Sequence, residues 1–185
     1  DDSVPVSEAT FLGIQEVLRK LYMDADVPKE VRRRILEAAV RAPKDWHQDA
    51  IRTAYSSDDE EWKLTAVFGM RFVRGFDDQI LEALESADPE IHYEAVCAAG
   101  DWEVDAAWSH ITALVTAEEA EKALRLAAID AVASIRPQEA GVILVELTES
   151  DDEEIVEAAY EAMAMAEGPA DDEFDGDENE DKFLD

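Results

Sequence analysis

Several features of secreted, membrane-bound or enzymatic proteins are scarce or missing in this 185-residue sequence. It has one cysteine, Cys97, so no disulfide framework can form within a single chain. No apolar run approaches the roughly 18–20 residues that a membrane span needs, and the acidic N-terminus is unlike a secretory signal. These absences predict an intracellular, cytoplasmic protein that does not bind membranes.

Motifs of enzyme chemistry are also missing. The three histidines, His47, His92 and His110, share no metal-ligand spacing. The sequence has no HExxH, no GxSxG, no glycine-rich phosphate loop and no nucleophile with an evident base. We therefore expect no catalytic residues, no cofactor and no metal site, and a protein that is not an enzyme.

Basic residues are scarce in the second half of the chain. Residues 1–75 carry 14 acidic and 12 basic side chains, whereas residues 76–185 carry 33 acidic and only 4 basic ones, a net charge of −29. A surface this negative repels phosphate backbones, which argues against DNA or RNA binding by this half. The charge favours a basic protein partner, or it is an adaptation for solubility in a salt-rich cytoplasm.

The last 18 residues concentrate this acidity. Residues 168–185 hold nine acidic side chains and one lysine. A segment this polar cannot bury a core, so the sequence predicts a disordered acidic tail over 168–185 after a folded region over 1–167.

What the sequence does contain is one apolar pattern that recurs five times. Apolar residues stand at its first, fifth, sixth and ninth positions, and a small residue stands at its eighth. This spacing follows the 3.6-residue period of an amphipathic helix. The copies begin at Val31, Trp62, Ile91, Leu124 and Ile155, a period of about 30 residues. Such a period predicts stacked pairs of helices.

A second apolar stretch precedes each copy, so we expect ten helices in five hairpins and no strand. The outer helices are predicted near 7–23, 45–56, 76–86, 103–115 and 137–149, and the inner ones near 28–42, 59–74, 89–100, 117–134 and 151–167. Asp58, Asp88 and Asp151 are expected to cap inner helices. The eighth position is always small, which would let neighbouring helices approach closely; its residues are Ala38, Gly69, Ala98, Ala131 and Ala162.

Three stretches carry a resemblance to a known family. They are Asp88-Pro89-x-Ile91-His92-x-x-Ala95, Val31-Arg32-x-x-Ile35 and Leu124-Arg125-x-x-Ala128. The pattern resembles the HEAT repeat, in particular the short HEAT-like repeats of phycobilisome lyase subunits, over roughly residues 7–167. The resemblance implies an all-α fold, an α-α superhelix of about five hairpins.

The same resemblance implies a ladder between neighbouring repeats, made by a turn aspartate and a basic residue early in the second helix. Its basic column would be Arg32, Lys63, His92 and Arg125, ending at Val156 in the fifth repeat. The column could instead be an anion-binding stripe. We favour structural neutralisation, because Asp59, Asp88 and Glu121 stand four residues before Lys63, His92 and Arg125.

A basic cluster and two tryptophans are candidate partner-binding residues. The arginines are Arg33, Arg34, Arg41, Arg71 and Arg74. They form either a solvated face paired with Glu30 and Glu37 or a docking patch for an acidic partner, such as the chain's own tail or another copy. Trp46 and Trp102 occupy matching Asp-Trp-x-x-Asp-Ala stretches, as interface anchors or as packing between repeats.

Three functional hypotheses remain. The first is a non-enzymatic scaffold that binds a basic protein partner along the acidic concave surface of the second helices. The second, implied by the resemblance, is a chaperone-like or lyase-associated subunit that handles a bilin or similar cofactor. The third is a stretch of a longer solenoid with no site of its own. The sequence does not indicate an oligomeric state.

Overall fold

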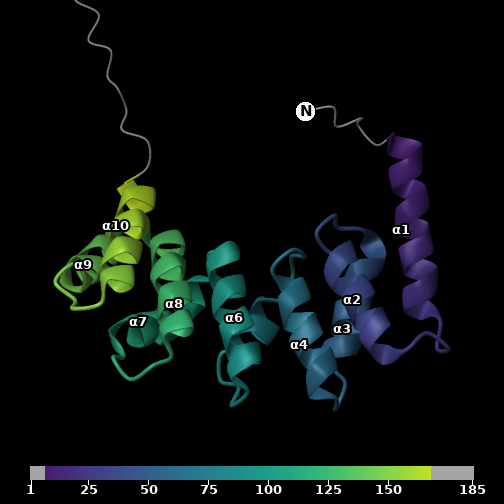
Figure 1. The fold of residues 1–185 in the computed structure, drawn as a ribbon, viewed down its shortest axis with the longest axis horizontal. Coiled ribbons are helices and arrows are strands. Elements are labelled where there is room, and N and C mark those ends of the chain that lie inside the picture. Colours follow the sequence, from purple (N-terminus) through teal and green to yellow (C-terminus); the bar gives the residue numbers. More distant parts are fainter. Residues whose placement is uncertain (1–6, 168–185) are drawn as a thin grey trace, which may run out of the picture.

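The computed structural model describes residues 7–167, and over this range the chain is helical (Figure 1). The all-α prediction is thereby confirmed. The predicted tail over 168–185 lies outside the described residues. The helices are α1 (Glu8–Met23), α2 (Lys29–Ala39), α3 (Asp45–Tyr55), α4 (Glu60–Met70), α5 (Asp77–Ala83), α6 (Pro89–Asp101), η1 (Asp105–Ala107, a 3₁₀ turn), α7 (Trp108–Thr116), α8 (Lys122–Ile135), α9 (Pro137–Leu147) and α10 (Glu153–Glu167).

The ten predicted helices correspond to α1–α10, with small differences at their ends. The largest concern the starts of two helices: α7 begins at Trp108 rather than near residue 103, after a positive φ at Glu103 and the 3₁₀ turn η1, and α8 begins at Lys122 rather than near residue 117. Residues 117–121 form a turn instead, in which the Ala120 amide donates to the Ala117 carbonyl at 3.1 Å.

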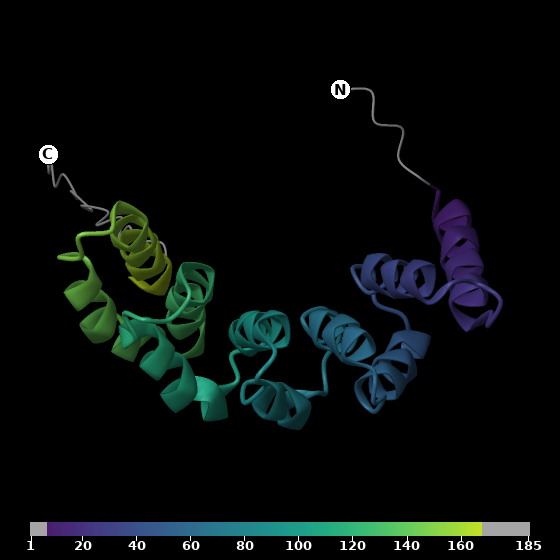
Figure 2. The same ribbon diagram turned by 60° about the horizontal axis from the view of Figure 1, so that its bottom comes forward.

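The inner helices pack on one another in chain order. The main contacts join α2 to α4, α4 to α6, α6 to α8, and α8 to α10. Figure 2 shows the helices in a curved row, with these five on the inner side of the curve and the odd-numbered helices on the outer side. The core runs along the whole row, from Tyr22 to Ala162. Among the helices of residues 7–167, none combines the length and apolar character that crossing a bilayer requires.

Small residues at the eighth position of the repeat let neighbouring helices approach closely, both within a hairpin and between successive inner helices. A Cβ added to Gly69 would lie 3.1 Å from Ile51 and 3.7 Å from Val40, both of which precede it in the row. The approach is closer still between α6 and α8, where a Cβ on Gly100 would lie 2.9 Å from the Cα of Ala131. The predicted close approach is therefore confirmed at these two interfaces.

Three of the inner helices begin with the same Ser-x-Asp turn. Ser57, Ser86 and Ser150 each accept a hydrogen bond from the amide of the aspartate two residues later. Those aspartates, in turn, accept a hydrogen bond from the amide two residues further on: they are Asp59, Asp88 and Asp152. The expected caps Asp58 and Asp151 are corrected by one residue, because the serine fixes the turn so that the second aspartate reaches the helix.

The other two inner helices, α2 and α8, share a different turn that uses arginine. Arg32 Nε donates to the Tyr22 carbonyl at 2.7 Å, and Arg125 donates to the Val115 carbonyl at 3.3 Å. In both cases the acceptor lies ten residues earlier, at the end of the preceding outer helix. The arginine thus satisfies a carbonyl that the end of a helix leaves without an intrahelical partner.

Candidate binding groove on the inner helices

The basic column expected to form the repeat ladder has other partners in the structure. Arg32 and Arg125 bond to backbone carbonyls within their own hairpins, as described above. Lys63 pairs with Glu60 at 3.0 Å rather than with Asp59. His92 Nε2 lies 2.9 Å from His110 Nε2. The acids placed four residues earlier are therefore not the partners of Lys63, His92 and Arg125, because turn and inter-hairpin contacts compete successfully for these side chains.

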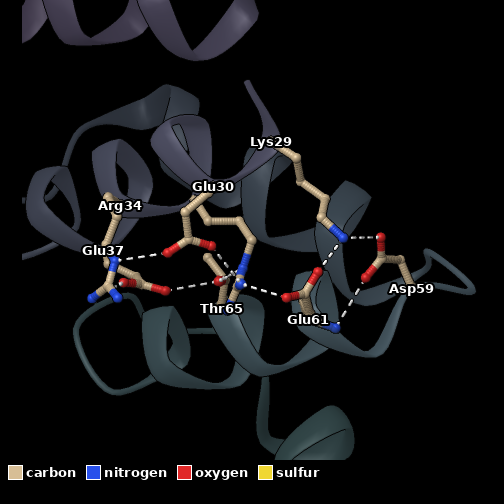
Figure 3. Close-up of polar contacts among 8 residues, drawn as sticks. Lys29, Glu30, Arg34, Glu37, Asp59, Glu61 and Thr65 are labelled. Atoms are coloured by element: carbon tan, nitrogen blue, oxygen red, sulfur yellow. Dashed lines mark hydrogen bonds and ion pairs between the residues drawn. The ribbon is translucent and has the colours of Figure 1, made fainter. Parts of the chain in front are cut away.

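Cross-interface rungs do occur, but they start from lysines two residues before the repeat. Lys29 Nζ lies 2.9 Å from Asp59 Oδ2 and also pairs with Glu61 (Figure 3). Lys122 repeats this arrangement at the last interface, 2.9 Å from Asp152 Oδ1 and paired with Glu154. Both lysine side chains lie partly exposed at the surface. The hydrogen bond from each lysine lowers the pKa of the aspartate that caps the next inner helix.

Neighbouring arginines of the basic cluster have opposite environments. The side chain of Arg34 is 75% exposed and pairs with Glu30 and Glu37, in agreement with the solvated-face interpretation. Arg33 is corrected as a docking residue, because its side chain is only 11% exposed. It points into the α2–α4 interface, where its Nε donates to Thr65 Oγ1 at 2.9 Å.

The remaining cluster arginines contact the chain itself. Arg71 Nε lies 2.8 Å from Asp101 Oδ2, and its Nη1 lies 3.2 Å from Glu94 Oε2. Arg41 lies over the rings of Phe68 and Phe72. Arg74 stacks on Trp102, with 4.4 Å between its Cζ and the ring centroid. These contacts divide the arginines among separate interfaces, so they do not form one continuous patch.

The two candidate anchor tryptophans are half-buried between hairpins. Trp46 packs on Tyr22 with their ring centroids 5.4 Å apart. Trp102 donates its indole Nε1–H to the Met70 carbonyl, which joins the end of α6 to the end of α4. Both positions agree with the interpretation as packing between repeats.

A large open cavity lies on the inner helices. It is an open groove of about 690 Å³ that crosses α2, α4, α6 and the start of α8. Its apolar floor is formed by Leu64 and Phe68 of α4, Tyr93 of α6 and Leu124 of α8. Sequence analysis did not identify this groove. The signal was present, since Leu64 and Phe68 are large apolar residues outside the five apolar positions of the repeat.

Acidic side chains surround that apolar floor. Glu37, Glu90, Glu94 and Glu121 line the groove. Glu94 is half-buried, and burial raises its pKa in spite of its contact with Arg71. Within residues 7–167, Glu90 and Glu121 form no ion pair, whereas Glu37 lies 3.9 Å from Arg34. The groove therefore offers two carboxylates without a cation beside four apolar side chains.

Each cation of residues 76–167 makes a contact within the chain. Residues 76–167 contain 24 acidic side chains and three basic ones, Lys122, Arg125 and Arg136. Lys122 and Arg125 hold the contacts described above, and Arg136 Nε lies 2.7 Å from Asp105 Oδ1. The α6–α8 side of the groove thus lies in a strongly acidic region, whereas Arg34, Arg41 and Arg71 contact groove residues from its α2–α4 side.

One wall of the groove contains a histidine pair. His92 lines the groove, and its partner His110 places Nδ1 3.3 Å from Glu85. Burial and the neighbouring His110 lower the pKa of His92. Within residues 7–167, no group of three His, Cys, Asp or Glu side chains is arranged to hold a metal ion.

Comparison with known proteins adds no family assignment. No protein-family model matches the chain, and no curated protein sequence matches it. The resemblance to HEAT repeats therefore remains a prediction from the repeat pattern.

Proposed function

We propose that the chain is a HEAT-like solenoid of five hairpins and a non-enzymatic scaffold. Its inner-helix groove binds a segment of a protein partner that carries both basic and apolar side chains. The repeating order of inner-helix contacts and the small eighth-position residues support the solenoid. The observation that supports the binding function is the combination of an apolar floor with unpaired carboxylates in one groove.

The groove supplies two kinds of interaction. Leu64, Phe68, Tyr93 and Leu124 offer apolar surface, and each square ångström buried stabilises the complex by about 25 cal/mol before the costs of association. Glu90 and Glu121 offer carboxylates to Lys or Arg of the partner. Long-range attraction to the acidic second half accelerates encounter and makes the association rate fall as salt rises.

The groove can be tested with a pair of model peptides. A fluorescent peptide of alternating Lys and Leu clusters, and its counterpart with Glu in place of Lys, are titrated with the protein while fluorescence anisotropy is recorded. We expect binding of the basic peptide only. The double variant Glu90→Lys, Glu121→Lys should weaken binding at least tenfold, because two attractive contacts become repulsive.

A matched control separates the groove from diffuse electrostatics. The double variant Glu146→Lys, Glu149→Lys changes the net charge by the same amount on α9 and the turn after it. It should weaken binding less than twofold. An equal loss of peptide affinity in both double variants would contradict binding in the groove. The variant Phe68→Ser should also bind the peptide more weakly, and an unchanged affinity would contradict the proposal as well.

The native partner can be sought with the same variants. Wild-type protein and both double variants are used in parallel to capture proteins from a lysate of the native host at low and high salt. A partner of the groove is retained by the wild type and by the α9 control variant, is lost from the groove variant, and is released by high salt. The proposal would be contradicted if neither the wild type nor the two double variants retained a specific protein at low salt.

A further inference from the structure

Equivalent positions of the five inner helices differ in burial at the two ends of the row. The sixth position of the repeat is fully buried in the first four copies, at Leu36, Val67, Val96 and Ile129. In the fifth copy it is Tyr160, which is 58% exposed. Because the same position is core in the other copies, Tyr160 marks a packing face of α10 that no described hairpin covers.

The eighth position of the repeat differs in burial at the opposite end of the row, on α2. It is buried in the last four copies, where the preceding hairpin packs against it, as Val40 does against Gly69. In the first copy this position is Ala38, and it is exposed. In the other inner helices this side packs against the preceding hairpin. In α2 the same side, marked by Ala38, is exposed.

Helix α1 extends this uncovered surface. Its hairpin matches that of α7 and α8, since Arg32 bonds to Tyr22 as Arg125 bonds to Val115, at the same spacing. By this match, Val17 corresponds to His110, which contacts His92 of the preceding hairpin. Ile14, Val17 and Leu21 lie along one side of α1 and are each between 41% and 55% exposed. Three apolar side chains thus stand where a preceding hairpin would be.

We propose that these two uncovered faces bind each other, so that copies of this chain associate head to tail. The tail face, defined by Tyr160 and Ala164 of α10, packs on the head face, defined by Ile14, Val17 and Leu21 of α1 and Ala38 of α2. The association continues the packing that already joins successive hairpins within one chain. Such a contact is heterologous, so it leaves one free face at each end of an assembly.

The charges at the two faces are complementary in the register used inside the chain. Between α2 and α4, the third and seventh residues of one copy, Arg33 and Glu37, both hydrogen-bond the fourth residue of the next, Thr65. Across the proposed junction, the third and seventh residues are Glu157 and Glu161. The fourth residue opposite them is Arg34, whose side chain is 75% exposed. In that register two carboxylates approach the exposed guanidinium of Arg34, which within one copy pairs with Glu30 and Glu37.

The overall charge sets the conditions for this association. Each copy carries a net charge of −31, so two copies repel at long range. At 1 M salt the screening length falls to about 3 Å, which removes this repulsion while the apolar contact persists. We therefore expect association to strengthen between 0.1 and 1 M NaCl, opposite to the salt response of the groove.

Mixing two singly blocked variants tests the proposal. Sedimentation velocity of the full chain at 1 M NaCl should show a weight-average sedimentation coefficient that rises with protein concentration. Val17→Glu blocks the head face and Tyr160→Glu blocks the tail face, so each variant alone should remain monomeric. Their equimolar mixture should give a dimer and no larger species, because one open head and one open tail remain.

The other outcomes overturn the proposal. Self-association of either variant alone would mean contact between identical faces, and association of both would mean non-specific adhesion. Wild-type protein that stays monomeric at both salts would exclude a second copy as the occupant. Competition by a synthetic peptide of residues 168–185 that depends on Arg34 but not on Tyr160 would assign the head face to the acidic tail.

A charge exchange provides a second, independent measurement. Arg34→Glu should weaken association at least fivefold at 0.3 M NaCl, and mixing this variant with Glu161→Arg should restore it. Melting curves recorded by circular dichroism verify that every variant is folded, which the exposure of the four substituted side chains favours. Failure of restoration in folded variants would contradict the proposed register.

Discussion

The first and third interfaces between inner helices join their hairpins in different ways. At the first interface, long polar side chains cross from α2 to α4, as Lys29 does to Asp59 and Arg33 does to Thr65 (Figure 3). At the third, α6 and α8 meet through small residues, with Gly100 against Ala131. The first half has nearly as many basic as acidic residues, whereas the second half does not. One repeat pattern can thus be assembled with polar bridges or with close backbone packing, and the Lys122 bridge between α8 and α10 shows that the acidic half uses both.

The largest expected effect concerns the close packing of α6 on α8. Gly100→Val should lower the free energy of unfolding by about 3 kcal/mol, because the new side chain would meet the backbone of Ala131 and force the helices apart. Urea denaturation measures the change. Gly13→Ala is the control: nothing lies within 4 Å of its Cβ, so we expect stabilisation by about 0.5–1 kcal/mol. An unchanged midpoint for Gly100→Val would show that the two interfaces do not differ in this way.

A smaller effect is expected for the polar bridge of the first interface. Arg33→Met should cost about 2 kcal/mol, because it removes the mostly buried hydrogen bond from Arg33 to Thr65 together with the ion pair to Glu61. The matched control is Arg34→Met, which removes an exposed cation and should cost less than about 0.5 kcal/mol. Equal urea midpoints for the two variants would contradict the assignment of Arg33 to the interface.

The two halves should also respond in opposite directions to salt. Raising NaCl from 0.1 to 1 M screens repulsion among the acids of α8–α10, so their amide-exchange free energy should rise by about 1 kcal/mol. The exposed ion pairs between α2 and α4 weaken under the same screening. Hydrogen exchange followed by mass spectrometry resolves the halves, provided the protein is dilute enough to remain monomeric. An equal change in amide-exchange free energy along the whole chain would contradict a difference in salt response between the halves.

The smallest effect is a pH dependence located in the second half, at the contact between His92 and His110. Burial and His110 lower the folded-state pKa of His92 below its ordinary value of 6.5. The unfolded chain therefore binds the proton more readily, and this contribution to stability is present above pH 6.5 and lost as pH falls towards the folded pKa. The melting temperature should drop between pH 7.5 and 5.5, and His92→Gln should reduce that drop. An equal drop in the variant would assign the effect elsewhere.

Local patterns in the sequence predicted the helices and part of their packing. Helical periodicity located all ten helices, and the small residue at Gly69 correctly indicated a close approach. The Ser-x-Asp turns were overlooked although Ser57, Ser86 and Ser150 recur at one spacing. A serine two residues before an aspartate was sufficient to place the cap at Asp59 rather than Asp58.

Contacts between hairpins could not be predicted in the same way. Arg33 and Arg34 are adjacent and chemically identical, and only the register of α2 against α4 decides which of them is buried. The His92–His110 contact joins residues 18 positions apart on different hairpins, which no helical spacing indicates. The groove likewise depends on how far Phe68 stands from Leu124 in space, a distance set by the packing of three successive helices.

The neighbour-only contacts of the inner helices have a mechanical consequence. Each interface between hairpins is formed by side chains of successive hairpins, as between Val40 and Gly69. The main helix contacts do not skip a hairpin. A rotation of a few degrees at every interface adds up along the row, while each interface stays packed. Small rotations at several interfaces would therefore change the curvature of the whole row more than they change any single hairpin.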